Sequence, residues 1–199
     1  MSTKRQAKTL PSAKVTPLRQ TYQIKVTLEH IKPTIWRRLL VDSRIPLADL
    51  HSAIQLSMGW EGVHLHHFID KQNTIYEPLN EDTFGFSNPE SVDESMVLLS
   101  ELLIKEKDWI KYEYDFGDGW EHKILLEKIL PMEKNQFPVR CIKGKRACPP
   151  EDCGGPWGYQ SILEALAEPD TQEHAELLEW LESDLEDPEY FSAAGKEDE

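Results

Sequence analysis

Three cysteines, the full complement of this chain, stand close together in the segment CIKGKRACPPEDCGGPWGY. Cys141, Cys148 and Cys153 are separated by six and by four residues. A structural zinc ion takes four ligands, commonly thiolates and imidazoles, and His122 or His174 could supply the fourth. The spacing matches neither the C-x2-C knuckle of zinc ribbons nor a C-x-x-C redox pair. Three interpretations therefore stay open: thiols that merely pack, a zinc site, and a reactive thiol.

The same segment also carries groups that bind anions. Lys145 and Arg146 are cationic, and Gly154 and Gly155 allow backbone amides to approach a ligand closely. Prolines and glycines together predict a rigid surface loop over residues 141–159. The aromatic candidates for stacking on a ligand, with packing in the core as the alternative, are Trp157 and Tyr159. The loop is thus expected to hold a structural metal or a small anionic group.

Histidines are concentrated in a second segment, VHLHHFID. If this segment is a strand, His64 and His66 point to the same face, which is one way in which sheets offer paired imidazoles to a metal. A catalytic zinc would need a third ligand and an open position for water. Nearby candidates for that ligand are His51, His67, Glu61 and Asp70. The alternative is that these histidines are bonded to the backbone or to carboxylates.

A third segment, YDFGDGWEH, places Asp115, Asp118 and His122 around one predicted hairpin tip. Its DFG triplet lacks the glycine-rich loop and the H-R-D motif of protein kinases. Its acids also lack the spacing of an EF-hand. Carboxylates and an imidazole are nevertheless the groups that metal-assisted hydrolysis uses. The plain alternative is that aspartates favour turns.

The elements that position these residues follow from hydrophobic periodicity. Alternating runs around Pro33 predict a hairpin, and GDG predicts the turn of a second hairpin. Helical spacing from Pro46 to Met58, followed by Gly59, predicts a helix. Two amphipathic helices are expected over 159–168 and 171–186, and a short one near 95–104. We therefore expect an α+β fold with a curved, largely antiparallel or mixed sheet and helices packed on one side.

Composition limits the partners of the chain. The chain has 199 residues and a net charge of −14, yet its first nineteen residues contain five basic residues and no acidic one. We expect a basic disordered tail over 1–20, a single domain over 21–192 and an acidic disordered tail over 193–199. The acidic body disfavours nucleic acid. A secretory signal and membrane-spanning runs are not seen, which predicts a cytoplasmic protein with reduced thiols.

The segments LEHIKPTIWRRLLV, LADLHSAIQLSMGW, HLHHF, YDFGDGWEH and ACPPEDCGGPWGY, in this order, resemble the Ri-plasmid open-reading-frame-three-like family from about Tyr22 to Phe191. The resemblance implies a compact α+β domain, an association with plasmids or mobile elements, and no established activity. The family's motif positions matched here are His64, His66, Asp115, Gly117, Asp118, Trp120, His122, Cys148, Pro149, Pro150, Asp152, Cys153, Gly154, Gly155 and Tyr159.

Two functions follow as hypotheses. The first is a non-enzymatic binding or accessory module whose cysteine loop holds zinc or binds a small anionic ligand or an unknown protein partner. The second is a metal-dependent hydrolase acting on nucleic acid or nucleotide. Its ligands or base would be His64, His66, Asp115, Asp118 and His122.

Overall fold

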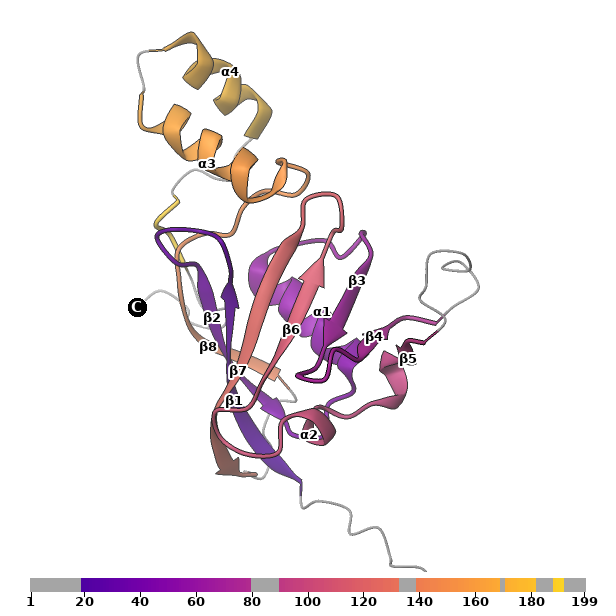
Figure 1. Cartoon of the computed structure of the whole chain (residues 1–199). Helices are drawn as coiled ribbons and strands as arrows, with labels where there is room; N and C mark the ends of the chain where they lie inside the picture. Colours follow the sequence, from indigo (N-terminus) through magenta and orange to yellow (C-terminus); the bar gives the residue numbers. More distant parts are fainter. Residues whose placement is uncertain (1–18, 80–89, 133–138, 169–170, 182–187, 192–199) are drawn as a thin grey trace, which may run out of the picture.

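The computed structural model describes residues 19–79, 90–132, 139–168, 171–181 and 188–191 (Figure 1). Both expected tails therefore lie almost entirely outside the described residues, as does part of the last predicted helix. Within the described residues, no helix is long and apolar enough to cross a bilayer.

The fold is built on an eight-stranded sheet in the order β5-β4-β3-β6-β7-β1-β2-β8. All pairs are antiparallel except β4 and β5, which run parallel. The strands are β1 (Gln20–Leu28), β2 (Trp36–Asp42), β3 (His66–Ile69), β4 (Ile75–Glu77), β5 (Val92–Asp93), β6 (Trp109–Tyr114), β7 (Trp120–Pro131) and β8 (Val139–Lys145). Both predicted hairpins, β1–β2 and β6–β7, are confirmed, and so is the α+β class.

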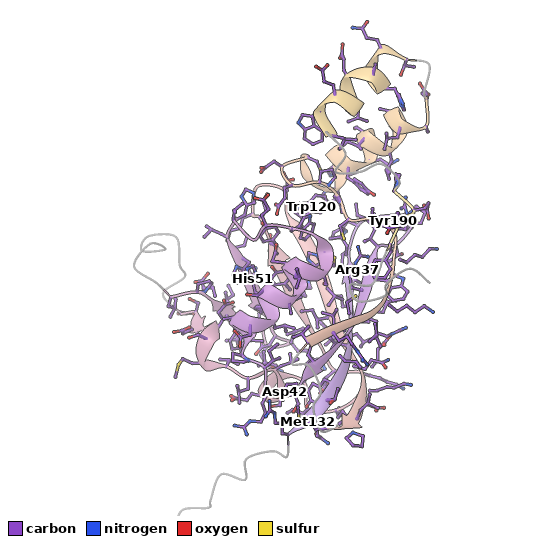
Figure 2. The ribbon with its side chains drawn as sticks, turned by 180° about the vertical axis from the view of Figure 1, so that it is seen from behind. Arg37, Asp42, His51, Trp120, Met132 and Tyr190 are labelled. Carbon is purple, nitrogen blue, oxygen red and sulfur yellow. The ribbon has the colours of Figure 1, made fainter. Side chains whose placement is uncertain are left out.

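One face of the sheet is covered by α1 (Leu47–Met58), as Figure 2 shows from behind. The helix follows Pro46 and ends at Gly59, whose φ of 88° is the left-handed conformation that glycine adopts readily. Leu50 and Ile54 on α1 are fully buried, as is every second residue from Ile24 on β1. This period-two burial is what a strand with one face on a core produces.

The short helices are η2 (Glu94–Met96) and α2 (Leu99–Leu102). The terminal pair, α3 (Gly155–Leu166) and α4 (Gln172–Leu181), lies at one end of the sheet instead of over its face (Figure 1). Only a few of its side chains, such as Tyr159 and Leu181, reach the core. Of the helices expected beside the sheet, α1 thus covers its face and the terminal pair extends from its end.

The cysteine segment is likewise not one loop. Its first residues form edge strand β8, which pairs with β2, and its last residues form the first turn of α3. Irregular chain is confined to residues between Lys145 and Gly155. The main chain of Gly158 lies so close to Cys153 that a Cβ at position 158 would overlap the carbonyl oxygen of Cys153. Because glycine has no Cβ, α3 can begin directly after this irregular segment.

Candidate functional site

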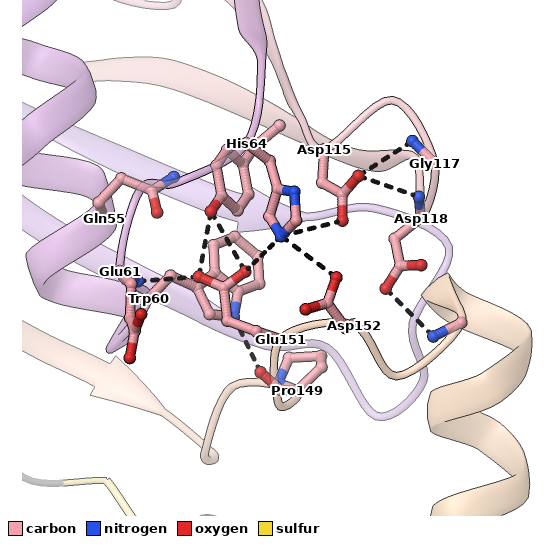
Figure 3. Close-up of polar contacts among 12 residues, drawn as sticks. Gln55, Trp60, Glu61, His64, Asp115, Gly117, Asp118, Pro149, Glu151 and Asp152 are labelled. Atoms are coloured by element: carbon pink, nitrogen blue, oxygen red, sulfur yellow. Dashed lines mark hydrogen bonds and ion pairs between the residues drawn. The ribbon is translucent and has the colours of Figure 1, made fainter.

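Three segments distant in sequence converge at the end of the sheet nearest α3 (Figure 3). They are the chain between α1 and β3, the tip of the β6–β7 hairpin, and the segment that precedes α3. The indole nitrogen of Trp60 donates to the carbonyl of Pro149 at 2.8 Å, and the amide of Asp115 donates to the carbonyl of Leu65 at 2.9 Å. These backbone-directed bonds hold the three segments in register.

The imidazole of His64 lies at the centre of this convergence. Its Nε2 atom is 3.2 Å from Oδ1 of Asp152, 3.7 Å from Oε2 of Glu151 and 3.8 Å from Oδ2 of Asp115. Two ligands on one ion, each about 2.1 Å from it, are separated by about 3.0–3.5 Å. The distance to Asp152 falls in this range, whereas the distance to Asp115 is slightly longer. The ligand atoms of His64, Asp115 and Asp152 all lie within 4.8 Å of one another, and among the described residues they are the one group of three that could hold a metal ion.

The charge of this cluster favours a cation. Three carboxylates face one imidazole, so their negative charge exceeds what even a protonated His64 supplies. The Nε2 atom of His64 is buried and makes no hydrogen bond with the described residues. The side chain of Asp152 is 73% exposed, which leaves a path from solvent to the cluster.

Hydrogen bonds fix the carboxylates in place. The hydroxyl of Tyr114 donates to both oxygens of Glu151, at 3.0 and 3.2 Å, and the amide of Glu61 donates to the same group at 2.8 Å. Burial, followed by the charge of Glu151, raises the pKa of Tyr114 to about 12, so the phenol remains a donor. The other oxygen of Asp115 accepts the amide of Gly117 at 3.0 Å. These bonds orient ligands much as outer partners do in metal sites.

Asp118 is near this cluster but has a different partner. Its carboxylate accepts the amide of Gly154, at 3.1 Å, just before α3. Negative charge is favoured at the start of a helix. The glycine-rich turn, predicted to bind an external anion through its amides, is thus occupied by a carboxylate of the same chain.

His66 does not join His64, because β3 begins at His66 and His64 lies in the irregular chain that precedes this strand. The prediction that the two imidazoles share one strand face is wrong. His66 lies under α1, where its Nε2 is 3.0 Å from the buried carboxylate of Glu94 and its ring stacks on His51 at 3.5 Å. Burial, and then the charge of His66, lowers the pKa of His51 to about 3. Nδ1 of His51 lies 2.7 Å from the hydroxyl of Tyr112.

His122 is also part of the core and not of the cluster. It is 1% exposed and lies between the rings of Trp60 and Tyr112, at 5.4 and 5.3 Å. Burial lowers its pKa to about 4, so the imidazole is neutral near neutral pH. It is therefore placed as a packing residue of an aromatic layer.

The thiols are not gathered around a common point. Within the described residues, no group of three metal-ligating atoms includes a cysteine. Sγ of Cys148 accepts a guanidinium proton of Arg37 at 2.9 Å and lies 3.2 Å from the sulfur of Met58. Burial raises the pKa of Cys148 to about 11 and that of Cys153 to about 12, and it also raises the pKa of Cys141. The geometry therefore does not support a zinc site made of these thiols and His122.

The predicted anion-binding and stacking residues have diverse environments. Arg146 is 4% exposed, pairs with Glu189 at 2.7 Å and donates to the carbonyl of Pro33, so its charge is used internally. The side chain of Lys145 is exposed on the edge strand. Tyr159 is fully buried in the core, whereas Trp157 is 86% exposed on α3. Neither aromatic residue contacts the His64 cluster in the interactions described.

Two members of the cluster were not singled out as ligands from the sequence. Asp152 appears among the matched motif positions, and Glu151 precedes it between prolines and Cys153. The sequence indicated these two residues as ligands only weakly, because acidic residues in a turn-rich segment are usually solvated. The signal that could have found them is the PPED sequence, in which prolines hold two consecutive acids on an irregular backbone.

The sheet, the covering helix α1 and the terminal helix pair define an α+β protein with a histidine–carboxylate cluster at the end of its sheet. The chain belongs to the family described as plasmid pRiA4b ORF-3-like protein, which matches residues 20–194. This confirms the family resemblance found in the sequence.

Two relatives illustrate the membership. The chain is 41% identical over 173 residues to the uncharacterized protein y4hQ of Sinorhizobium fredii (strain NBRC 101917 / NGR234), covering 86% of this chain and 84% of that protein. The crystal structure of the protein of unknown function MM3350 from Methanosarcina mazei Go1 superposes with a TM-score of 0.75 at 36% identity, covering 88% of this chain and 97% of that one. Neither description names an activity.

Proposed function

We propose that this protein is a divalent-metal-binding module in which His64, Asp115 and Asp152 hold the ion. The observation that carries the proposal is the position of Nε2 of His64, which faces three carboxylates and makes no hydrogen bond with the described residues. A divalent cation would neutralise the excess negative charge and occupy the space between the four groups. Glu151, held by Tyr114, would be a fourth ligand or would bind water on the ion.

The donor set indicates which ions to expect. One imidazole with several carboxylates suits borderline and hard cations such as Zn²⁺, Mn²⁺ and Mg²⁺, with affinity rising in the order Mg²⁺, Mn²⁺, Zn²⁺. Thiolates are absent from the proposed set, which separates it from a structural zinc knuckle.

The proposal is tested by isothermal titration of Mn²⁺ and Zn²⁺ into chelator-treated protein. We expect one site per chain, and His64→Ala lowers its affinity at least about tenfold. The matched control is His67→Ala, because His67 also faces a carboxylate, Glu113 at 3.1 Å, but lies outside the cluster. Loss of binding in Cys148→Ala with retention in His64→Ala would instead establish the thiol site.

A metal-dependent hydrolase is the second candidate, and one observation favours it. Glu151 lies 3.7 Å from Nε2 of His64, where a carboxylate could act as a base toward water on the ion. The acids that surround the cluster repel polyphosphates and disfavour nucleic acid as its substrate. If the protein hydrolyses a nucleotide or an ester in a metal-dependent reaction, and the Glu151→Gln variant does not, the enzyme hypothesis becomes better supported than the binding module.

The association with plasmids or mobile elements and the cytoplasmic location remain expectations from the sequence. The proposed module requires neither of them, since metal binding would depend on the cluster alone.

A further inference from the structure

A cleft of about 610 Å³ adjoins the cluster on the side of α1 and α4. Its walls come from the end of α1, the segment that follows it, the segment before α3 and the chain around Tyr190. Figure 2 shows Arg37 and Tyr190 on this side of the molecule, below α3 and α4. Glu151 and Asp152 line the cleft as well as the cluster, so the two features share a wall.

Apolar side chains surround the opening of the cleft. Leu56 is 82% exposed, Val63 69%, Tyr190 63% and Trp180 52%. Single exposed apolar residues are ordinary, but a group of them around one hollow with a polar margin is typical of a protein-interaction site. Their positions on four separate segments favour an occupant long enough to contact several of them at once.

The charge of the cleft is negative. Glu61, Glu151 and Asp152 line it, and Arg37 is the cation among the described lining residues. Arg37 is 3% exposed, and its guanidinium donates to Cys148 and to four backbone carbonyls, including those of Ser57 and Arg146. Its donors are therefore directed into the protein, and the acids present their charge to an occupant.

We propose that this cleft binds a peptide segment of a partner protein in which Lys or Arg residues alternate with aliphatic or aromatic ones. The apolar side chains of the segment pack on Leu56 and Val63. Its cations face Glu61 and Asp152, and the exposed rings of Trp180 and Tyr190 add faces on which a guanidinium or ammonium can lie. The net charge of −14 attracts such a segment at long range.

This inference does not require the proposed metal function, although the two are linked through Asp152. An ion on Asp152 removes negative charge from the cleft, so Mn²⁺ and the peptide weaken each other's binding by the same factor. Peptide binding in chelator with no response to Mn²⁺ would support the cleft and count against the metal site. The two proposals therefore fail separately.

The test uses fluorescence anisotropy with the full chain in chelator and three labelled pentapeptides. They are Trp-Lys-Leu-Arg-Leu, its neutral analogue Trp-Gln-Leu-Asn-Leu and its acidic analogue Trp-Glu-Leu-Asp-Leu. We expect the basic peptide to bind below about 1 mM and at least tenfold more tightly than the acidic one. Its affinity should fall with added salt, because the charges of the cleft margin are solvent-exposed.

Variants with matched controls test whether the peptide binds in this cleft. Glu61→Lys should weaken binding of the basic peptide about tenfold, because it reverses a charge of the cleft. The substitution should leave the cluster intact, because only the backbone amide of Glu61 supports it. Glu101→Lys makes the same charge change outside the cleft and should leave binding unchanged. Val63→Lys should weaken it as well, whereas Met96→Lys, at a site 75% exposed elsewhere, should not. Equal binding of the three peptides, no binding of the basic one, or equal effects in both members of a pair would overturn the proposal.

Discussion

Gly155 lies directly against the main chain of Asp118, and a Cβ at Gly155 would overlap the carbonyl oxygen of Asp118. This close approach joins the tip of the β6–β7 hairpin to the start of α3. The amide of Gly154 adds a hydrogen bond to the carboxylate of Asp118. The two contacts fix the segment that carries Asp152 beside the segment that carries Asp115.

Gly155→Ala should therefore lower the free energy of unfolding by about 3 kcal/mol, because it combines backbone strain with a collision. Gly119→Ala is the matched control, since Gly119 has the same φ of 68° but a Cβ there would meet no other atom within 4 Å. It should cost only about 1–2 kcal/mol. Urea denaturation of both variants measures the difference, and equal losses would show that the contact with Asp118 relaxes freely.

Arg37→Lys should destabilise the protein by about 2 kcal/mol, even though the charge is kept. The guanidinium of Arg37 reaches several carbonyls and Cys148 simultaneously, which an ammonium cannot do. The exposed Arg140 on β8 supplies the control Arg140→Lys, which should change stability by less than about 0.5 kcal/mol. Thermal unfolding of the two variants checks this, and similar melting temperatures would contradict it.

Stability should fall as the pH is lowered from about 6.5 toward about 4. Burial lowers the pKa of His122 to about 4 in the folded state, while an unfolded histidine takes up its proton near pH 6.5. The unfolded chain thus binds more protons in this window, and each such proton gives a slope of up to about 1.4 kcal/mol per pH unit. His51, with a pKa lowered to about 3 chiefly by burial, acts in the same direction.

His122→Leu should reduce this slope, whereas His30→Leu should not, because the side chain of His30 is 59% exposed. Urea denaturation at about pH 5 and about pH 7 measures the slope for each variant. An unchanged slope in His122→Leu would mean that His122 can be protonated without unfolding.

Tyr114→Phe should weaken metal binding about tenfold, because Glu151 loses the donor that orients its carboxylate. Tyr76→Phe removes a hydroxyl that also donates to a carboxylate, Asp70 at 2.9 Å, but at a distance from the cluster. It should leave the metal affinity unchanged. Titration of Mn²⁺ into both variants checks the expectation, and equal affinities would show that Glu151 takes no part in holding the ion.

The three thiols should react slowly with iodoacetamide in the folded protein. Burial raises the pKa of Cys148 to about 11, so near neutral pH its thiolate is about a hundredfold scarcer than that of a free thiol. Unfolding in guanidinium should make all three react. Mass spectrometry of labelled protein measures the rates, and rapid labelling of Cys148 before unfolding would indicate an accessible, activated thiol instead of a packed one.

The strands of the two hairpins and α1 could be predicted because their signals are local. Each of these elements has a signal that reflects a backbone preference within a few residues. The signals are the alternation from Ile24 to Leu28, the glycines after Asp115, and the helix boundaries at Pro46 and Gly59. The start of α3 was missed, since the segment before Tyr159 reads as a loop from its glycines and Pro156. Proline is in fact favoured in the first turn of a helix, as found here.

The sequence alone determined the family, the α+β class and the concentration of chemically capable residues in three segments. Which of those residues meet was decided only by the tertiary structure. His64 faces Asp115 and Asp152, while His66 turns to Glu94 and His122 is buried among aromatic rings. The physical reason is that a side chain's spacing along the chain fixes its direction only within one strand or helix. Where strands end and segments cross, packing contacts such as that between Gly155 and Asp118 set the distances.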